Sequence, residues 1–409
     1  MIPPEHDSAG IRQQDPRPLL IYGAGVVGKV LYQLCEALGL TVEAFCDGST
    51  ARANTTFCDR PVIHASDLPH HYQDARFLIS VASIKDVVDK LHELGYRTWK
   101  AGGPLLKQYR TSPSPQGSSF NYVDFAVETC IWCHDAYLAG SGLFIRSVDV
   151  VITERCSLRC KDCSNLMQYY ENPRDCDWDK LMASIGRFCD LVDDVLEFRV
   201  IGGEAFMNKR WPQVVGHLVS QPKAKRVVLY TNGTILPPKN GLEALKHPKV
   251  LVIISNYGKI SRKLLPLKKA LEDMGIKHYI LNIDSWLDCA RIEPHHRPSP
   301  ENKRLFADCC AKNMLTLSDG RLHRCPFSAN AFRLGAIPDF PTDYVDLFEA
   351  PLSEARENLR KEIWNYLHKK EFLHTCDFCN GRPLAGPEVL PAVQIGKPLP
   401  YRKYEMSAS

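Results

Sequence analysis

The stretch VDVVITERCSLRCKDC, residues 148–163, decides how the central part of the chain folds. Its apolar first half predicts a strand over 147–153, and its second half predicts a loop with cysteines at positions 156, 160 and 163. Three thiolates in such a loop can bind three corners of a cubic iron–sulfur cluster and leave the fourth iron open to a small molecule. The alternatives are a loop without function and a structural zinc site. A closed zinc site usually takes four protein ligands, and this loop offers three.

Strand and helix patterns alternate around this loop over residues 143–293. Strands are expected at 147–153, 195–201, 227–231, 250–255 and 277–282. Helices are expected between them, for example at 178–191 and 262–274. The pattern predicts an α/β fold with a central partial (β/α)6 barrel, in which chemistry takes place at the C-terminal ends of the strands.

Further motifs stand at the ends of the next three expected strands. Gly202-Gly203-Glu204 ends the second strand, Asn232 follows the third, and Ser255 ends the fourth. Together with the CxxxCxxC loop, they resemble the radical S-adenosylmethionine (radical SAM) enzymes, whose GGE motif binds the methionine amino group of S-adenosylmethionine (SAM). Two positions depart from that family's pattern without removing a ligand: Asp162 replaces an aromatic residue, and Ala205 replaces a proline.

The resemblance implies two cofactors for this part of the chain, a 4Fe–4S cluster and SAM. The implied cluster ligands are Cys156, Cys160 and Cys163. The implied SAM contacts are Gly202, Gly203, Glu204, Asn232 and Ser255. In this chemistry one electron, from a donor such as flavodoxin or ferredoxin, cleaves SAM, and the resulting 5′-deoxyadenosyl radical abstracts a C–H hydrogen from the substrate.

A second group of cysteines lies in a C-terminal Cys-rich region, expected over residues 294–390. It comprises the pair Cys309-Cys310, then Cys325, Cys376 and Cys379. One cysteine of the pair with the other three can fully ligate one 4Fe–4S cluster, and four thiolates also satisfy zinc. Spacing permits either member of the pair, and Cys310 is weakly favoured. The order resembles the SPASM or shorter twitch extension of radical SAM enzymes. Because no cysteine follows Cys379, we expect a single auxiliary cluster.

The N-terminal region, residues 17–103, has the pattern of a small nucleotide-binding unit. Gly23, Gly25 and Gly28 follow a strand and open a helix, and Asp47 ends the next strand, where an acid can bind a ribose. With about three expected strands the unit is Rossmann-like but short. It resembles the nucleotide-sugar-binding domains of sugar-modifying acyltransferases. The alternative is a unit that binds nothing and supports the barrel. Residues 104–142 are expected to form a linker and a helix.

These features predict a radical SAM oxidoreductase or epimerase that acts on a small molecule, with a sugar or nucleotide-sugar as the suggested class. Cys289, in the loop after the fifth strand, is considered as a hydrogen-atom donor for epimerisation, with a buried loop thiol as the alternative. Two other functions stay open. One is maturation of a ribosomal peptide, and the other is a non-catalytic iron–sulfur or zinc protein such as a sensor.

Composition sets the outer limits of this prediction. The 409 residues are 44% hydrophobic and 24% charged, which is typical of a globular protein. A net charge of +4 is too small to demand nucleic acid or an anionic membrane as a partner. Residues 1–18 lack the layout of a signal peptide, and no apolar run is long enough to span a membrane. We therefore expect a cytoplasmic protein whose 16 cysteines are thiols, so that clustered ones are metal ligands or catalysts.

Overall fold

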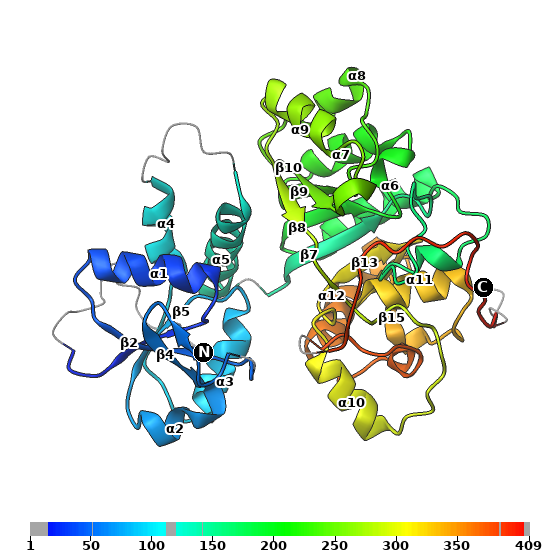
Figure 1. Ribbon diagram of the computed structural model, residues 1–409. Coiled ribbons are helices and arrows are strands. Elements are labelled where there is room, and N and C mark those ends of the chain that lie inside the picture. Colours follow the sequence, from blue (N-terminus) through cyan, green and yellow to red (C-terminus); the bar gives the residue numbers. More distant parts are fainter. Residues whose placement is uncertain (1–14, 51, 112–119, 141, 384–385, 405–409) are drawn as a thin grey trace. The chain divides into compact units, whose positions relative to one another are not determined.

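The chain folds into two compact units, which are described separately (Figure 1). The structure is a computed structural model and describes residues 15–50, 52–111, 120–140, 142–383 and 386–404. The units are Met1–Ser141 and Gly142–Ser409, so the regions expected at 143–293 and 294–390 share one unit. Both units are α/β with mainly parallel strands, as predicted. Among the described residues, no helix combines the length and the apolar character needed to cross a membrane.

A six-stranded sheet in the order β3-β4-β2-β1-β5-β6 forms the centre of the N-terminal unit. The strands are β1 (Leu19–Tyr22), β2 (Val42–Asp47), β3 (Thr56–Phe57), β4 (Arg60–His64), β5 (Arg76–Ile79) and β6 (Trp99–Ala101). All neighbours are parallel except β3 and β4, which are antiparallel. The three strands expected from the sequence, at 19–22, 41–45 and 77–81, correspond to β1, β2 and β5. The sequence did not predict β3 and β6, because two or three residues leave no pattern, and it did not predict β4, in which Val62 and Ile63 are the only apolar pair and follow a proline.

Helices cover both faces of this sheet. They are α1 (Val26–Ala37), α2 (Leu68–His71), α3 (Ile84–Glu93), α4 (Gly103–Thr111) and α5 (Tyr122–Leu138). Buried side chains of α1, α4 and α5 join one apolar cluster with the sheet, and those of α2 and α3 join another. Because β1 contributes to both clusters, the sheet centre is buried on both faces.

Helix α4 corrects the linker expected from residue 104. Residues 104–111 are helical, and Leu106 is fully buried in the cluster that contains Leu31 and Val127. The serines and prolines further along the segment suggested an irregular chain, but Pro104 lies in the first turn, where a helix tolerates proline. The rest of the expected linker, 112–119, lies outside the described residues.

An eight-stranded sheet in the order β11-β10-β9-β8-β7-β13-β14-β15 forms the C-terminal unit. The strands are β7 (Phe144–Val151), β8 (Asp194–Ile201), β9 (Ala224–Thr231), β10 (Val250–Asn256), β11 (His278–Asn282), β13 (Leu315–Ser318), β14 (Arg321–His323) and β15 (Tyr344–Asp346). Strands β7 to β11 match the five predicted strands and are parallel. The sixth parallel strand, β13, lies beside β7 rather than after β11.

Helices and a small strand pair complete this unit. The helices are α6 (Trp178–Leu191), α7 (Trp211–Val219), α8 (Lys239–Leu242), α9 (Leu264–Asp273), α10 (Ser299–Asp308), α11 (Pro326–Leu334) and α12 (Leu352–His368). The short strands β12 (Trp286–Leu287) and β16 (Glu388–Val389) pair antiparallel. Helix α6 lies at the predicted residues, and α9 lies within the predicted 262–274.

The two faces of the parallel strands differ in polarity. Residues such as Val148, Val150 and Phe198 pack with buried side chains of α6 and α7 in the main apolar cluster. Successive side chains of a strand point to opposite faces. The alternate positions therefore lie on the other face, and there they include Asp149 and Arg199, which are directly opposite each other in register. The sheet thus carries buried charged side chains on the face opposite α6 and α7.

Candidate functional site

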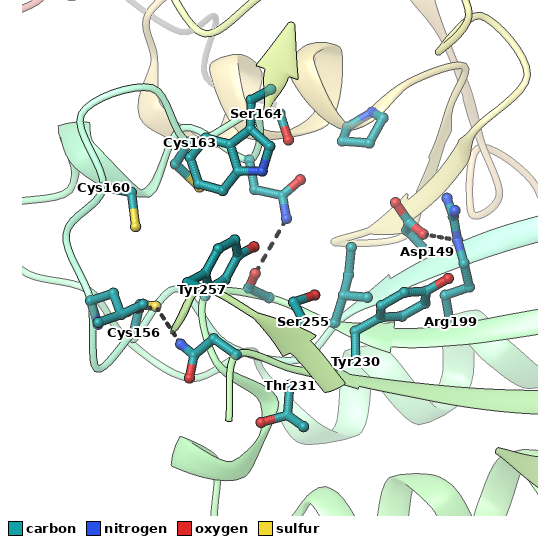
Figure 2. Close-up of a pocket in the computed structure, with 18 of the residues that line it drawn as sticks. Asp149, Cys156, Cys160, Cys163, Ser164, Arg199, Tyr230, Thr231, Ser255 and Tyr257 are labelled. Carbon is teal, nitrogen blue, oxygen red and sulfur yellow. Dashed lines mark hydrogen bonds and ion pairs between the residues drawn. The ribbon is translucent and has the colours of Figure 1, made fainter. Parts of the chain in front are cut away.

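A cavity of about 290 Å³ lies where strands β7 to β10 end (Figure 2). Its lining includes most of the predicted cluster and SAM residues, namely Cys156, Cys160, Cys163, Gly202, Gly203, Asn232 and Ser255. Tyr257 and Trp286 add aromatic surface. The structure therefore brings together residues that are spread over one hundred positions of the sequence.

Gly202 and Gly203 are required because the cysteine loop passes directly against the end of β8. The Gly203 N–H donates to the Thr153 carbonyl at 2.9 Å. A Cβ on Gly202 would lie 2.2 Å from the Thr153 carbonyl oxygen, and one on Gly203 would lie 2.4 Å from the Arg155 carbonyl oxygen. These distances are too short for any side chain. The glycine pair thus sets the position of the cysteine loop.

Glu204, the third residue of this motif, is 1% exposed and is absent from the residues that line the cavity. Its Oε2 accepts from the Asn232 N–H at 2.7 Å, and its Oε1 accepts from the Phe206 N–H at 3.2 Å. Burial raises the pKa of this carboxyl group to about 7, against the hydrogen bonds, which lower it. In this structure Glu204 fixes the ends of two strands, and its contact with SAM stays a prediction.

Asn232 connects the end of β9 to the cysteine loop. Its Nδ2 lies 3.2 Å from Ser157 Oγ and 3.7 Å from Cys156 Sγ, and donates to both. Its Oδ1 accepts from the Thr234 N–H at 3.0 Å, which fixes the orientation of the amide. The side chain therefore holds one cysteine of the loop through a hydrogen bond to sulfur.

The C-terminal segment around Gln394 covers the same loop, and no sequence pattern indicated it. Gln394 Nε2 donates to Cys160 Sγ at 3.2 Å, and Gln394 Oε1 accepts from the Arg159 N–H at 2.8 Å. On either side of Gln394 the backbones also pair: the Lys161 N–H donates to the Val393 carbonyl, and the Ile395 N–H donates to the Arg159 carbonyl. The contact joins residues more than 230 positions apart, so only the folded chain reveals it.

Burial keeps the three loop thiols neutral in the absence of a metal. It raises the pKa of Cys160 to about 11 and also raises the pKa values of Cys156 and Cys163. The Cys163 thiol adds to the rise at both other cysteines, so the three are electrostatic neighbours. Metal binding has to displace these protons. Within the described residues, no three His, Cys, Asp or Glu side chains lie close enough to hold a single metal ion.

The opposite side of the cavity is charged (Figure 2). Arg199 Nε lies 2.6 Å from Asp149 Oδ1, and Tyr230 and Arg382 also line this side. Burial raises the pKa of Asp149 to about 6, and the neighbouring guanidinium limits the rise. Glu197 of β8 and Arg226 of β9 are also directly opposite each other in register, and they form a buried ion pair with 3.0 Å between Oε2 and Nη2. None of these charged residues was predicted, although charged residues at alternate positions of apolar strands are a pattern that indicates them.

The second cysteine group comes from three separate segments. Cys309 follows α10, Cys325 precedes α11, and Cys376 and Cys379 lie in and after the 3₁₀ turn His374–Phe378. Burial raises the pKa values of the last three thiols, and Cys309 adds to the rise at each of them. Cys309 is half-buried, whereas the adjacent Cys310 is exposed.

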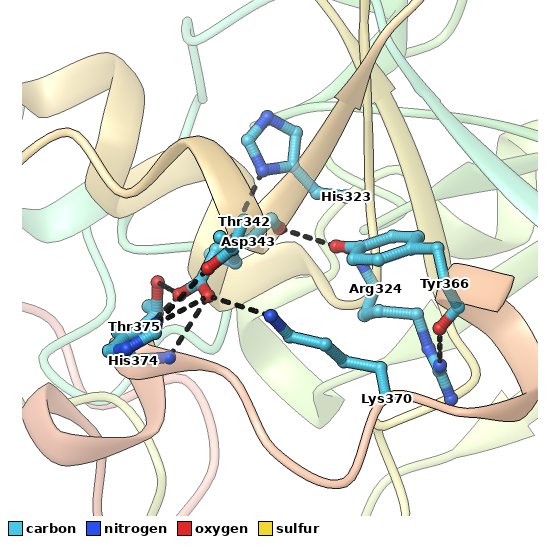
Figure 3. A network of polar contacts seen from close by, with 9 residues as sticks. His323, Arg324, Thr342, Asp343, Tyr366, Lys370, His374 and Thr375 are labelled. Atoms are coloured by element: carbon cyan, nitrogen blue, oxygen red, sulfur yellow. Dashed lines mark hydrogen bonds and ion pairs between the residues drawn. The ribbon is translucent and has the colours of Figure 1, made fainter. Parts of the chain in front are cut away.

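A buried polar network holds the backbone beside this group (Figure 3). Asp343 Oδ2 accepts from the Thr375 N–H and from Thr375 Oγ1, both at 2.7 Å, and its Oδ1 accepts from the His374 N–H at 3.0 Å. Arg324, next to Cys325, donates to the Leu367 carbonyl at 3.0 Å. Two buried charged residues thus fix the positions from which Cys325 and Cys376 project.

Cys289 lies with the second cysteine group and is not among the residues that line the cavity. It is 6% exposed, and burial raises its pKa to about 11. Smaller contributions come from Arg382, which lowers the pKa, and from Cys309 and Cys310, which raise it. Its role as a hydrogen-atom donor stays a prediction.

The glycine turn of the N-terminal unit is fixed by its own neighbours. Gly23 has φ +112°, and a Cβ on Gly28 would lie 2.0 Å from the Gly23 carbonyl oxygen. Asp47 Oδ2 accepts from the Ala24 N–H and its Oδ1 accepts from the Ser49 N–H, both at 2.9 Å. A Cβ on Gly25 would meet only Arg52 Nη1, at 3.4 Å. Nucleotide binding by these residues stays a prediction.

Comparison with known proteins gives only distant similarity. No family model and no curated protein matches the chain. Among solved structures, BtrN in complex with AdoMet and 2-DOIA is 16% identical over 58% of this chain and 93% of its own, with a TM-score of 0.38. Native anSMEcpe with bound AdoMet and Cp18Cys peptide is 17% identical over 34% and 43%, with a TM-score of 0.28. Streptococcus suis SuiB is 17% identical over 48% and 44%, with a TM-score of 0.29. The chain thus spans less than half the length of two of these proteins, and the similarity is too low to assign a family.

Proposed function

We propose that the chain is a radical SAM enzyme. The observation that carries this proposal is the meeting of three loop cysteines with Gly202, Gly203, Asn232 and Ser255 around one cavity at consecutive strand ends. Thiolates are soft ligands that suit iron–sulfur clusters, and three of them leave one iron open. The polar strand ends beside them supply amide, hydroxyl and backbone groups for an amino acid and a ribose.

The chain's own residues would hold the cluster and keep water away from the reacting groups. Cys156, Cys160 and Cys163 would hold the 4Fe–4S cluster, and Asn232 and Gln394 donate hydrogen bonds to two of their sulfurs. When bound, the cluster and SAM supply a 5′-deoxyadenosyl radical that takes a hydrogen atom from a C–H bond. Tyr257 and Trp286 pack edge to face, with ring centroids 5.6 Å apart. Both line the cavity, where their apolar surface would help to exclude water from the reaction.

The second cysteine group would hold one auxiliary 4Fe–4S cluster in a SPASM/twitch-like extension. The proximity of Cys309 to Cys325, Cys376 and Cys379 supports Cys309 as the fourth ligand in place of the initially favoured Cys310. Four cysteines close the coordination of such a cluster. A cluster held by these cysteines would supply an acceptor for the one electron that a substrate radical loses, together with a proton, in a dehydrogenation, and in an epimerisation it would only shape the pocket.

The substrate we propose is a small molecule of the sugar or nucleotide-sugar class, with flavodoxin or ferredoxin as the electron donor in the cytoplasm. The parallel strand order β4-β2-β1-β5-β6 supports a Rossmann-like N-terminal unit, because it places the chain reversal between β1 and β5. Ligands of such sheets bind outside the strand ends at this point. Gly23 follows β1 and Ser80 follows β5, so the glycine turn stands there.

The test is anaerobic reconstitution followed by iron counting and a SAM cleavage assay. Two 4Fe–4S clusters predict about eight irons per chain, and reduction with SAM should release 5′-deoxyadenosine. Cys160→Ser should abolish release, whereas Cys58→Ser, a half-buried thiol of the N-terminal unit, should not. Intact, reduced, iron-loaded protein that releases no 5′-deoxyadenosine would contradict the enzyme assignment, and about four irons would contradict the auxiliary cluster.

A further inference from the structure

The charged side of the cavity has no role in holding the cluster or SAM as proposed above. The three cysteines lie on one side of the cavity and Asp149, Arg199 and Tyr230 on the other, with Ser255 between them (Figure 2). A bound SAM molecule would occupy the space beside the cysteines. The charged side is therefore the space that remains for substrate.

Ion pairing leaves this side with an excess of positive charge. Asp149 pairs with Arg199 at 2.6 Å, and the deeper Glu197 pairs with Arg226 at 3.0 Å. Arg382 also lines the cavity, and within the described part of the chain it makes no ion pair. Several arginines among the described residues have a buried N–H group without a hydrogen-bond partner, and two of these groups, Arg382 Nε and Arg199 Nη2, belong to residues that line the cavity. Buried charged donors without acceptors are costly, and at these two residues an anion inside the cavity would supply the acceptor.

The second cysteine group fixes the position of Arg382. The Arg382 carbonyl accepts from the Cys310 N–H at 2.9 Å, and Gly381, its neighbour, donates to Cys379 Sγ at 3.2 Å. The guanidinium acts electrostatically on Asp149 on one side and on Cys289 on the other. The backbone of Arg382 is thus held by the second cysteine group, while the residue lines the cavity within electrostatic reach of Asp149.

From this arrangement we infer that Arg382 and Arg199 bind an oxyanion of the substrate, a carboxylate or a phosphate, on the side of the cavity away from the cysteine loop. The inference rests on the proposed function and specifies its substrate class. Guanidinium groups bind such oxyanions through paired N–H donors. Asp149 and the Tyr230 hydroxyl add groups that accept and donate to substrate hydroxyls. The expected substrate is therefore a polyhydroxylated compound that carries one oxyanion.

The test uses three sugars of similar size that differ in charge: glucose 1-phosphate, glucuronate and glucose. Their affinities for the anaerobically reconstituted protein with SAM are measured by calorimetry. We expect at least one charged sugar to bind about tenfold or more tightly than glucose, since a hydrogen bond to a charged group contributes about 1.5–3 kcal/mol. The two charged probes distinguish a phosphate from a carboxylate.

Variants then assign the preference to its residue. Arg382→Gln should remove the preference, and Arg382→Lys should keep part of it, because lysine retains the charge without the planar donor pair. Arg304→Gln, which removes an exposed arginine of α10, is the matched control and should bind like the wild type. The iron content of Arg382→Gln shows whether the variant is folded, and Arg382→Lys provides the comparison if it is not.

The outcomes separate this inference from the proposed function. Protein that cleaves SAM but shows no preference for either charged sugar, including no measurable binding of both, overturns the oxyanion site. An equal loss in Arg382→Gln and Arg304→Gln overturns it as well. Protein that prefers a charged sugar through Arg382 but cleaves no SAM supports the site and contradicts the enzyme assignment.

Discussion

The two cysteine groups of the C-terminal unit are assembled in different ways. The first is one loop of eight residues, from Cys156 to Cys163, at the end of a single strand, and it opens into the cavity. The second collects cysteines from three segments, and none of them is among the residues that line that cavity. The position of the loop is set by the backbone that packs against it. The position of the second group depends on buried polar residues, such as Asp343 and Arg324, that hold its separate segments. The first arrangement leaves room for a reacting molecule, and the second is the one for which we propose a closed site.

The largest expected effect comes from Gly203→Ala, which tests the placement of the loop. The new Cβ would lie 2.4 Å from the Arg155 carbonyl oxygen and 2.7 Å from the Cys156 Cβ, so the loop has to move. We expect the loss of about four of about eight irons, and with them all release of 5′-deoxyadenosine.

The matched control for this variant is Gly216→Ala in α7. Nothing lies within 4 Å of its added Cβ, and alanine is favoured over glycine in a helix by about 0.5–1 kcal/mol. This protein should keep its iron and unfold at a slightly higher urea concentration. Full iron and activity in Gly203→Ala would show that the glycine pair does not position the loop.

The next effect separates the second group from the first. Cys309→Ser should remove about four irons and leave those of the loop, so that 5′-deoxyadenosine is still released. Cys310→Ser is the matched neighbour and should keep about eight irons, because Cys310 is exposed. Iron and sulfide analysis of the two variants decides between the adjacent cysteines. The reverse result would restore the initial weak preference for Cys310.

The difference between the two groups also explains what the sequence could predict. The loop, the five parallel strands and the glycine pair were predicted because each leaves a local pattern of spacing or alternation. The partner of Cys160 could not be predicted, since Gln394 is brought to it by the folding of the C-terminal segment. The choice between Cys309 and Cys310 likewise depends on side-chain direction after α10. Strands β3 and β6 were missed because two or three residues carry no periodicity.

A smaller effect is expected from Gln394→Ala, which removes a distant hydrogen bond from the loop. The amide donates to Cys160 Sγ at 3.2 Å, and hydrogen bonds to sulfur stabilise the thiolate and tune the cluster potential. We expect a loss of about tenfold in resistance to iron chelation, the usual range for residues that support metal ligands, and a lower reduction potential. Lys397→Ala, on the same segment, should change neither quantity. If the reduction potential of the cluster is unchanged in Gln394→Ala, this segment covers the loop without tuning the cluster.

The smallest effect concerns Asp162, which occupies the position where the radical SAM pattern usually has an aromatic residue. Asp162 Oδ1 lies 2.8 Å from Arg291 Nη2, and its side chain is 7% exposed, so the pair ties the cysteine loop to the segment that follows Cys289. Removing one partner alone leaves the other charge buried and unpaired, so the stability of a single variant does not report the strength of the ion pair. A double-mutant cycle with Asp162→Asn and Arg291→Gln isolates the pair, and we expect a coupling energy of about 1 kcal/mol. Urea unfolding followed by cluster absorbance reports this unit alone. A coupling near zero would mean that the loop is held by Gly203, Asn232 and Gln394 without help from the segment that leads to the second cysteine group.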